Sequence, residues 1–324
     1  MCIAGPGAVG TTLGARLALK GHAVAVVARA ESARAIRTNG LRLIDSSGEH
    51  RVAVTVLEPN EARPQDVIFL CPKAQDLASL AASVEPLIGE ETLIVPVING
   101  IPWWYFEGEQ SRYAGRLINA VDADGTIKRL LPLKQVIGCV AVMTADRIAA
   151  GFARSLNPMR LTIGEIDNRI TGRIERLAGT LSDCGIAARV SPRIRDALWT
   201  KVILNLISNP LSVVAGATLR DICADPALSR ITRQLIDEAL LTAASYGARV
   251  ECDVRSLLEL GASMGDTKTS MLQDFEKGAP LELQAICDSV LELAEIQGLQ
   301  MPLTRNIAIL ARYRSALASN SAAE

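Results

Sequence analysis

A glycine-rich turn near the start of the chain constrains the fold more than any other feature. The segment Gly5-Pro-Gly7-Ala-Val-Gly10 has the spacing G-x-G-x-x-G, between a short apolar run and an alanine- and leucine-rich stretch. The first glycine permits a tight turn, the second lets the backbone approach a pyrophosphate, and the third allows close packing of helix and strand. A chance turn is the alternative, but the run Ala23–Ala28 comes where a second parallel strand is expected. The predicted phosphate-binding residues are Gly5, Pro6, Gly7, Ala8, Val9 and Gly10.

The pattern along the chain predicts an α/β fold. The first half alternates β-branched runs with helical stretches, which is typical of β-α-β units and a mainly parallel sheet. From about Asp167 the alternation stops, and apolar residues recur at helical spacing. We predict an N-terminal Rossmann-type doubly wound parallel sheet with a C-terminal all-α domain. The predicted parts are 1–167 for the dinucleotide-binding domain, 168–190 for a linker helix and connection, 191–318 for the helical substrate domain and 319–324 for a tail.

Individual elements are predicted from the same periodicities. The strands are Met1–Ala4, Ala23–Ala28, Val52–Val56, Val67–Cys71, Thr92–Val97, Val136–Val142 and Arg160–Gly164. The helices are Val9–Lys20, Ser32–Asn39, Ala74–Leu87, Ile170–Cys184, Arg193–Val214, Ser229–Tyr246, Val254–Leu260, Thr269–Glu276, Leu281–Gln297 and Asn306–Ala316. The first strand is so short that either the true start lies upstream or this strand is trimmed.

Charge and hydropathy exclude several classes of function. The 324 residues carry 34 Lys+Arg against 35 Asp+Glu, a formal net charge of −1, without a basic block. Nucleic-acid recognition needs a concentrated basic surface, so no nucleic-acid partner is expected. Apolar runs such as Asp66–Cys71 are interrupted long before the ~20 residues of a membrane span, and Met1 leads into the glycine turn instead of a signal peptide. We therefore expect a cytoplasmic protein without a membrane partner.

The cysteines and histidines limit the available chemistry. The seven cysteines are scattered without a C-x-x-C pair, as expected of small buried hydrophobic residues in a reducing compartment. The only histidines, His22 and His50, lie in a turn and a polar stretch that do not resemble a catalytic pocket. Acid–base chemistry must then come from Lys, Asp, Glu or Tyr, and no metal site is predicted.

The end of the second predicted strand indicates which cofactor is bound. NAD enzymes commonly place Asp or Glu there to accept from the ribose 2′-hydroxyl, but this chain has Arg29, whose guanidinium suits a 2′-phosphate. We therefore predict NADP(H). The alternative is an exposed arginine in a site of mixed preference, because Glu31 is close enough to reach a ribose.

A polar stripe marks an otherwise apolar helix in the second half. Lys201, Asn205 and Asn209 recur every four residues, so they drift only about 80° around a helix and share one face. Burying an ammonium and two amides is costly unless they have partners, which favours a bound ligand or a dedicated hydrogen-bonded network. The alternative is a lysine that extends to solvent and asparagines that cap a helix kinked at Pro210.

Lys201 suits one reaction in particular. Hydride addition to a ketone builds negative charge on the oxygen, and an ammonium within hydrogen-bond reach stabilises and protonates that alkoxide. Lys73 and Asn99 each follow a predicted strand, at the carboxyl edge where open α/β sheets bind ligands. A surface lysine and a turn asparagine are the alternatives. Ser270 and Glu282 are further candidate site residues. The alternatives are that Ser270 only starts a helix and that Glu282 is a solvated surface glutamate.

Taken together, these motifs resemble the ketopantoate reductases (2-dehydropantoate 2-reductases), within the 6-phosphogluconate dehydrogenase-like group. The resemblance runs in order over nearly the whole chain, and its most specific parts lie in the second half. The matching pieces are Gly5–Gly10 with Gly14, Arg29, Pro72-Lys73, Asn99-Gly100, Leu198-Trp199-x-Lys201-x-x-x-Asn205-x-x-x-Asn209-Pro210-Leu211, Ser270-Met-Leu-Gln-Asp274, Lys277-Gly278, Glu282 and Gly298 to Pro302.

The resemblance implies NADPH-dependent reduction of a small branched 2-oxo acid, of the type that converts 2-dehydropantoate to pantoate in pantothenate biosynthesis. Lys201 would be the proton donor, and Glu282 would contact the cofactor ribose or the reacting centre. Asn205, Asn209 and Ser270 would hold the substrate. Lys73 and Asn99 would line the nicotinamide side, with Asn99 also touching the substrate.

Some positions depart from the family pattern. Glu282 is followed by Leu283-Gln284 where Ile-Asp is usual, and Cys287-Asp288 stands where an Asn-Gly pair is expected. Leu219 replaces an asparagine expected to touch the substrate. An insertion-like stretch from Pro102 to about Gln135 carries the aromatic run Trp103–Phe106, which is either packing or the wall of a larger pocket.

These departures keep other functions open. One alternative is a related NADP-dependent oxidoreductase that acts on a different 2-oxo acid, carbonyl or imine. Another is a non-catalytic NADP sensor, which would bind the cofactor and be indifferent to loss of Lys201. A homodimer is plausible but is not fixed by the sequence.

Overall fold

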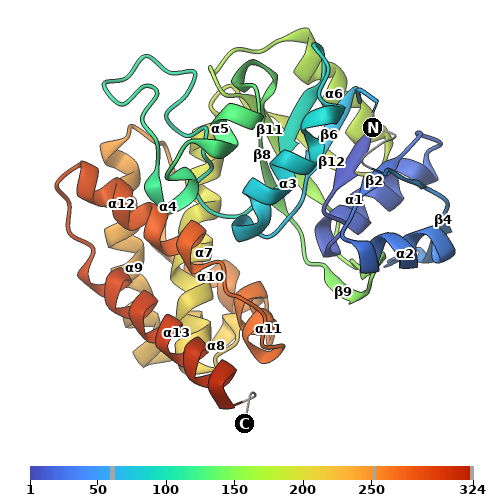
Figure 1. The fold of residues 1–324 in the computed structure, drawn as a ribbon. Coiled ribbons are helices and arrows are strands. Elements are labelled where there is room, and N and C mark those ends of the chain that lie inside the picture. Colours follow the sequence, from blue (N-terminus) through green and yellow to red (C-terminus); the bar gives the residue numbers. More distant parts are fainter. Residues whose placement is uncertain (59–62, 251–252, 322–324) are drawn as a thin grey trace. The chain divides into compact units, whose positions relative to one another are not determined.

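The computed structural model describes residues 1–58, 63–250 and 253–321 (Figure 1). The chain divides into two compact units, and each is described by itself. Unit 1 comprises Met1–Ile98, Trp103–Leu117 and Asp122–Ile194, and unit 2 comprises Asn99–Pro102, Ile118–Val121 and Arg195–Glu324. The division of labour between a dinucleotide-binding part, 1–167, and a substrate part, 191–318, stays a prediction.

A five-stranded parallel sheet forms the centre of unit 1, in the order β5-β2-β1-β6-β7. Its strands are β1 (Cys2–Ala4), β2 (Ala25–Val27), β5 (Thr55–Val56), β6 (Val67–Leu70) and β7 (Leu93–Pro96). Taken in chain order, the third strand lies at one edge and the first in the middle, which is the doubly wound arrangement of dinucleotide-binding domains. The predicted α/β Rossmann-type fold is confirmed.

Helix α1 (Ala8–Leu19) packs tightly against β1 and against β3 (Leu41–Asp45) of a second sheet. Gly14 makes this approach possible, because a Cβ there would lie 2.9 Å from Leu41 Cδ1 and 3.0 Å from Ile3 Cγ1. Leu13 and Leu17 of the same helix are fully buried in the core of unit 1. The helix is thereby held with its amino end at the glycine turn.

Two smaller sheets complete unit 1. A four-stranded sheet has the order β4-β3-β10-β9, and a three-stranded sheet has the order β12-β11-β8. Their remaining strands are β4 (Gly48–Val52), β9 (Asp146–Ala149), β10 (Phe152–Arg154), β8 (Ile137–Val142), β11 (Arg160–Glu165) and β12 (Ala187–Val190). An isolated parallel bridge between Ile94 and Val136 connects β7 to the start of β8. Helix α6 (Gly172–Asp183) joins β11 to β12.

Several predicted elements differ from the observed ones. The predicted strand Val52–Val56 is two strands of different sheets, because Val52 pairs with Leu41 in a hairpin whereas Val56 pairs with Val26. The predicted helix Ala74–Leu87 consists of α3 (Leu77–Val84) between two 3-10 turns, η2 (Ala74–Asp76) and η3 (Glu85–Leu87), and Pro86 cannot supply the amide that an α-helix needs. Four strands of the two smaller sheets, β3, β9, β10 and β12, were not predicted.

The aromatic run Trp103–Phe106 lies in the interior of unit 1. Its four side chains are each 1–3% exposed, and the rings of Tyr105 and Phe106 meet edge to face at 5.1 Å. Gly138 of β8 accommodates Trp104, since a Cβ there would lie 2.9 Å from the indole ring. Packing, the first of the two interpretations of this run, is therefore confirmed.

Unit 2 is helical, as predicted. Its helices are α7 (Ile194–Ala215, of which Ile194 belongs to unit 1), α8 (Leu219–Ala224), α9 (Pro226–Ser245), α10 (Val254–Ser263), α11 (Ser270–Glu276), α12 (Ser289–Ile296) and α13 (Pro302–Ser321). Helix α9 begins three residues before the predicted Ser229, because Asp225 accepts from two backbone amides and Pro226 occupies the first turn. Helix α8, which was not predicted, begins with a capping box formed by Thr218 and Asp221.

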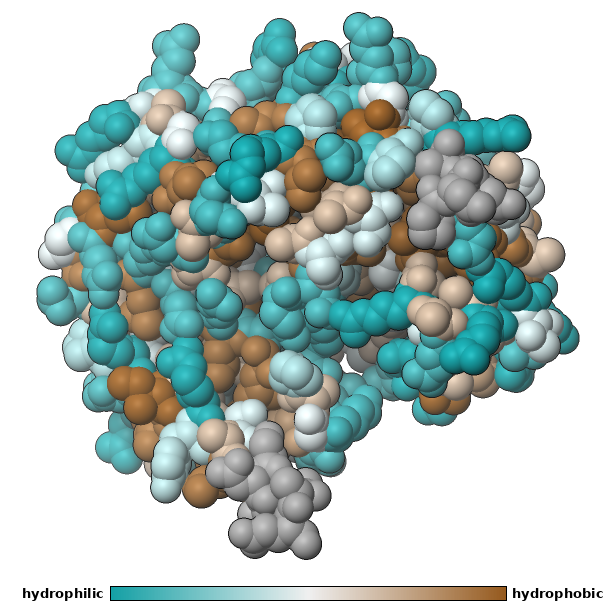
Figure 2. Space-filling model, viewed as in Figure 1, coloured by the Kyte–Doolittle hydropathy of each residue, from teal (hydrophilic) through white to brown (hydrophobic). Residues whose placement is uncertain are grey.

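Helix α7 corrects one expectation from the sequence. By length and composition alone it could cross a membrane, whereas from the sequence we expect no apolar run long enough for a membrane span. Most of its apolar stretch is buried in the structure, as in the core helix of a globular domain. The visible face of the molecule is largely hydrophilic, with apolar side chains in small groups (Figure 2). The cytoplasmic location and the homodimer stay predictions.

Candidate active site

The predicted phosphate-binding turn has open space beside its middle glycine. Gly5 has φ +85°, and a Cβ there would lie 3.1 Å from the carbonyl group of Cys71. A Cβ at Gly10 would lie 2.5 Å from the Gly5 carbonyl oxygen, whereas one at Gly7 would meet nothing within 4 Å. Packing therefore demands glycine at the first and third positions only. Packing does not require glycine at position 7, so the open space beside Gly7 fits the close approach of a ligand.

The amino end of α1 fits an anionic group. Gly7 is the N-cap residue, and its side chain can supply no cap, so the first amides of the helix lack a capping group. No acidic residue lies in the first turn. Free amides and the positive end of the helix dipole suit a pyrophosphate, so Gly5, Pro6, Gly7, Ala8, Val9 and Gly10 fit the cofactor that they were predicted to bind.

Arg29 and Lys73 lie at the same carboxyl edge of the sheet. Arg29 follows β2 and precedes α2 (Ala30–Asn39), with its side chain 78% exposed. Its guanidinium lies 2.6 Å from the carboxylate of Asp76. Lys73 follows β6 as the residue before η2 and is partly buried. Both are placed on loops that flank the glycine turn, because β2 and β6 are the two neighbours of β1.

The polar stripe on α7 is present in unit 2. Asn205 and Asn209 are buried, with exposed fractions of 8% and 3%, and Lys201 is partly buried one turn before Asn205. Burial lowers the pKa of Lys201 from its ordinary value, because dehydration disfavours the ammonium. The Nδ2 atom of Asn209 has no hydrogen-bond partner among the described residues. An unsatisfied buried donor on this face suits a ligand that brings its own acceptor.

Asn99 belongs to unit 2 and connects two of its elements. Its Oδ1 accepts from Asn205 Nδ2 at 3.3 Å, and its Nδ2 donates to Glu282 Oε2 at 3.3 Å. Glu282 is 5% exposed. The three predicted residues thus form one hydrogen-bonded network, although they come from three distant parts of the sequence.

The turn that carries Asn99 is seated on an irregular piece of helix. Residues Gln284–Asp288 form a π-helical turn, η5, directly before α12. The Ala285 carbonyl accepts from Ile101 N at 3.2 Å, and a Cβ on Gly100 would lie only 2.1 Å from the same oxygen. Gly100 also has φ +84°, so only glycine allows this docking. Such π-turns are frequent at functional sites.

Ser270 is not drawn into this network. It is the first residue of α11, and it is exposed. The buried hydroxyl next to it belongs to Thr269, which caps α11 and shares a 2.6 Å hydrogen bond with Ser212 of α7. Sequence reasoning missed Thr269 and Ser212, because a threonine before a helix and a serine within one give no signal of their pairing.

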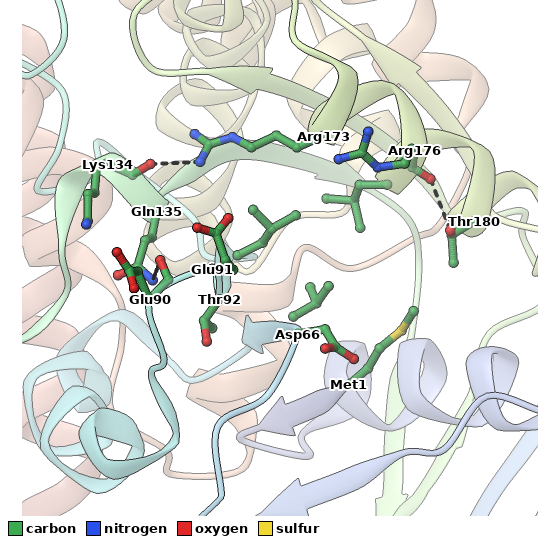
Figure 3. Close-up of a pocket in the computed structure, with 13 residues that line it drawn as sticks. Met1, Asp66, Glu90, Glu91, Thr92, Lys134, Gln135, Arg173, Arg176 and Thr180 are labelled. Atoms are coloured by element: carbon green, nitrogen blue, oxygen red, sulfur yellow. Dashed lines mark hydrogen bonds between the residues drawn. The ribbon is translucent and has the colours of Figure 1, made fainter.

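The hollow drawn in Figure 3 lies elsewhere in unit 1. It has a volume of about 560 Å³ and is lined by residues at the amino ends of β6, β7 and α6, such as Asp66, Glu91 and Arg173. Arg173 is held there by Glu165 and by the Lys134 carbonyl. No predicted site residue lines this hollow, and ligands of doubly wound sheets bind at the opposite edge of the strands.

The remaining chemistry-bearing residues are cysteines and histidines outside the network of Asn99, Asn205 and Glu282. Among the described residues no three His, Cys, Asp or Glu side chains gather as metal ligands. The six cysteines that the structure describes are free. Burial raises the pKa of Cys2 and of Cys139 to about 12, which keeps both thiols protonated. His50 pairs with Asp45 on the hairpin of β3 and β4, and so it serves a local structural role.

Comparison with known proteins identifies the family. The model of the ketopantoate reductase PanE/ApbA family matches residues 1–103, and the model of its C-terminal domain matches residues 193–314. A 2-dehydropantoate 2-reductase of Mesorhizobium japonicum is 34% identical over 312 residues, which cover 96% of each chain. The chain belongs to the ketopantoate reductase family. This member of the family is accordingly a nicotinamide-dependent oxidoreductase that acts on a 2-oxo acid, and the family resemblance of its motifs is confirmed.

Solved structures show the same relationship. A putative ketopantoate reductase from Ralstonia solanacearum has a TM-score of 0.92 and 34% identity, over 98% of this chain and 97% of its own. A 2-dehydropantoate 2-reductase from Geobacter metallireducens has a TM-score of 0.84 and 28% identity, over 97% and 99%. The ketopantoate reductase fold thus extends over the whole chain, including the insertion-like stretch.

Proposed function

We propose that this protein reduces a small branched 2-oxo acid of the 2-dehydropantoate type, with NADPH as reductant and Lys201 as proton donor. The observation that carries the proposal is the stripe on α7. It presents a dehydrated lysine, an asparagine held by Asn99, and Asn209, whose buried Nδ2 lacks a partner among the described residues. Burying polar groups without partners is costly, and a polar ligand would supply the missing partner.

The stripe supplies what carbonyl reduction needs. When hydride reaches the keto carbon, the carbonyl oxygen becomes an alkoxide. The Lys201 ammonium donates a hydrogen bond to this oxygen and then transfers its proton, which leaves a neutral hydroxyl and a neutral amine. Dehydration lowers the pKa of Lys201 and so makes its ammonium a stronger acid than that of an exposed lysine. Solvent reprotonates the amine after the product leaves.

The asparagines and the network hold the substrate. The Nδ2 of Asn209, which has no partner within the described part of the chain, is a donor for one carboxylate oxygen of the substrate. Asn205 is oriented by Asn99, which is oriented in turn by Glu282. We assign Ser270 as a further substrate ligand through its exposed hydroxyl. Glu282 fixes the network and contacts the cofactor ribose or the reacting centre.

Unit 1 holds the cofactor in this proposal. The bound nicotinamide supplies the hydride. The glycine turn and the amino end of α1 bind the pyrophosphate, and Arg29 binds the 2′-phosphate. Lys73 and Asn99 face the nicotinamide side.

Oxidation of NADPH with a panel of 2-oxo acids tests the proposal. The panel contains 2-dehydropantoate, an unbranched 2-oxo acid of similar size and an aromatic 2-oxo acid, each also tested with NADH. We expect kcat/KM to be highest for 2-dehydropantoate by at least ~10-fold, because a missing branch forfeits buried apolar contact. Equal rates across the panel would reject 2-dehydropantoate as the preferred substrate. Equal rates with NADPH and NADH would reject NADPH as the preferred cofactor.

A second candidate is reduction of a different 2-oxo acid. Leu219 stands where the family resemblance expects an amide, which favours a substrate with one fewer polar group. The buried aromatic run gives this candidate no support, because its rings pack in the interior. The panel distinguishes the two when it also contains a branched 2-oxo acid without the 4-hydroxyl group, because the second candidate predicts a higher kcat/KM for that acid than for 2-dehydropantoate.

A further inference from the structure

An ion pair crosses the carboxyl edge of the five-stranded sheet at its central strand. Arg29 follows β2, and Asp76 ends the 3-10 turn that follows β6. Arg29 Nη2 lies 2.6 Å from Asp76 Oδ1. Because β2 and β6 flank β1 on its two sides, the ion pair connects the loops on either side of the glycine turn.

Asp76 does not use its carboxylate to cap the helix that follows it. It is the N-cap residue of α3, where an aspartate commonly accepts hydrogen bonds from the first turn of the helix. Its side chain accepts none there. The carboxylate is directed instead to the guanidinium of Arg29 on the other loop.

The ion pair is easily exchanged. The side chains of Arg29 and Asp76 are 78% and 37% exposed, so solvent screens their attraction. A phosphate carries more charge than a carboxylate and offers an arginine two parallel hydrogen bonds. A 2′-phosphate can therefore take the guanidinium of Arg29 away from Asp76.

We propose that Asp76 is a specificity-determining residue, whose carboxylate competes with the 2′-phosphate for Arg29 and lowers the preference for NADPH over NADH. The inference rests on the proposed binding of that phosphate by Arg29. NADPH must separate the ion pair and place its phosphate beside the released carboxylate, which repels it. NADH has no 2′-phosphate and leaves the pair intact. Its ribose hydroxyl is moreover a group that a carboxylate at this edge can accept from.

The test is the substitution Asp76→Asn, which keeps the shape of the side chain and removes its charge. Dissociation constants for NADPH and NADH are measured by fluorescence titration of the full-length protein, without a substrate. We expect the dissociation constant for NADPH to fall by about 2- to 5-fold, within the range of exposed ion pairs. The constant for NADH should stay the same or rise.

Two further variants isolate the ion pair. Glu85→Gln makes the same change in net charge at the other end of α3, where Glu85 is exposed, and should leave the NADPH-to-NADH ratio unchanged. In an Arg29→Ala background, Asp76→Asn should no longer tighten NADPH binding, because the contested guanidinium is absent.

Three outcomes would overturn the inference while the proposed function stands. They are weaker NADPH binding by Asp76→Asn, equal changes for both cofactors, and a gain that persists without Arg29. Weaker NADPH binding would show that Asp76 orients Arg29 for the phosphate instead of competing with it. A wild-type protein that binds neither dinucleotide would refute the proposed function and this inference together.

Discussion

Asn99 Nδ2 donates a 3.3 Å hydrogen bond to Glu282 Oε2, although the two residues stand 183 positions apart in the sequence. The other end of the same amide accepts from Asn205 of α7. Both ends of the Asn99 side chain are therefore used, and its orientation is fixed. The buried Glu282 is the anchor of this arrangement.

Loss of the Asn99–Glu282 contact should impair catalysis without abolishing it. Glu282→Ala frees the Asn99 amide to rotate, and we expect kcat/KM to fall by about 10-fold or more, within the effect of supporting interactions at a site. Glu282→Gln keeps an acceptor oxygen for Asn99 and should lose less. Steady-state kinetics of both variants, with thermal unfolding as a control for folding, check this order. Equal losses would mean that the charge of Glu282, and not its contact with Asn99, is what matters.

Removal of the proton donor should affect turnover selectively. Lys201→Ala should lower kcat by about 10²-fold or more, in the range of general-acid groups, while the affinity for NADPH stays unchanged. Lys268→Ala is a matched control, because Lys268 is an exposed lysine of the same unit, paired with Glu276. Full activity of Lys201→Ala would refute Lys201 as the proton donor, whereas NADPH binding without turnover by the wild-type protein would support the sensor alternative.

The pH dependence of turnover should report the pKa of Lys201. Burial lowers this pKa, and the reaction needs the ammonium, so kcat should fall as pH rises through the lowered value. The alkaline midpoint should thus lie below 10.5, the ordinary lysine value. Lys201→Arg keeps its proton at every accessible pH and should remove this alkaline fall while reducing the rate. An alkaline fall that is unchanged in Lys201→Arg would assign it to another group.

Two glycine substitutions should separate cofactor binding from stability, because one affects only NADPH binding and the other affects the folded state. Gly7→Ala adds a Cβ in open space, so the protein should remain as stable as wild type while NADPH binding weakens by about 10-fold. Gly100→Ala places a Cβ against the Ala285 carbonyl at a positive φ, and should destabilise the protein by about 2 kcal/mol. Thermal unfolding and fluorescence titration of NADPH measure the two effects. Tight NADPH binding by Gly7→Ala would count against pyrophosphate at this turn.

The sequence predicted what local patterns encode. The glycine turn, the buried parallel strands and the stripe on α7 all have short-range signatures, in glycine spacing, β-branched runs and four-residue recurrence. Four strands of the smaller sheets escaped prediction, because strands such as β9 are short and largely exposed. The single predicted strand 52–56 was wrong because two sheets meet there without a break in hydropathy.

The site itself was predicted only as separate residues. Asn99 was chosen for its place after a strand, but its union with Asn205 and Glu282 depends on long-range packing that no local pattern contains. The ion pair of Arg29 with Asp76 was missed for the same reason. Ser270 was chosen through the family resemblance, and its hydroxyl takes no part in the network.

The π-helical turn Gln284–Asp288 has a consequence for how this region tolerates change. A π-turn is in effect one residue more than an α-helix would use, and each α-helical residue rotates the chain by about 100°. Because the π-turn spreads one revolution over this extra residue, deleting a single residue here would give a regular α-helix and leave the flanking residues in nearly the same orientation. The backbone of the turn itself would change, and with it the position of the Ala285 carbonyl that accepts from Ile101. The shortened helix would thus be more regular but would lose the seat of the Asn99 turn.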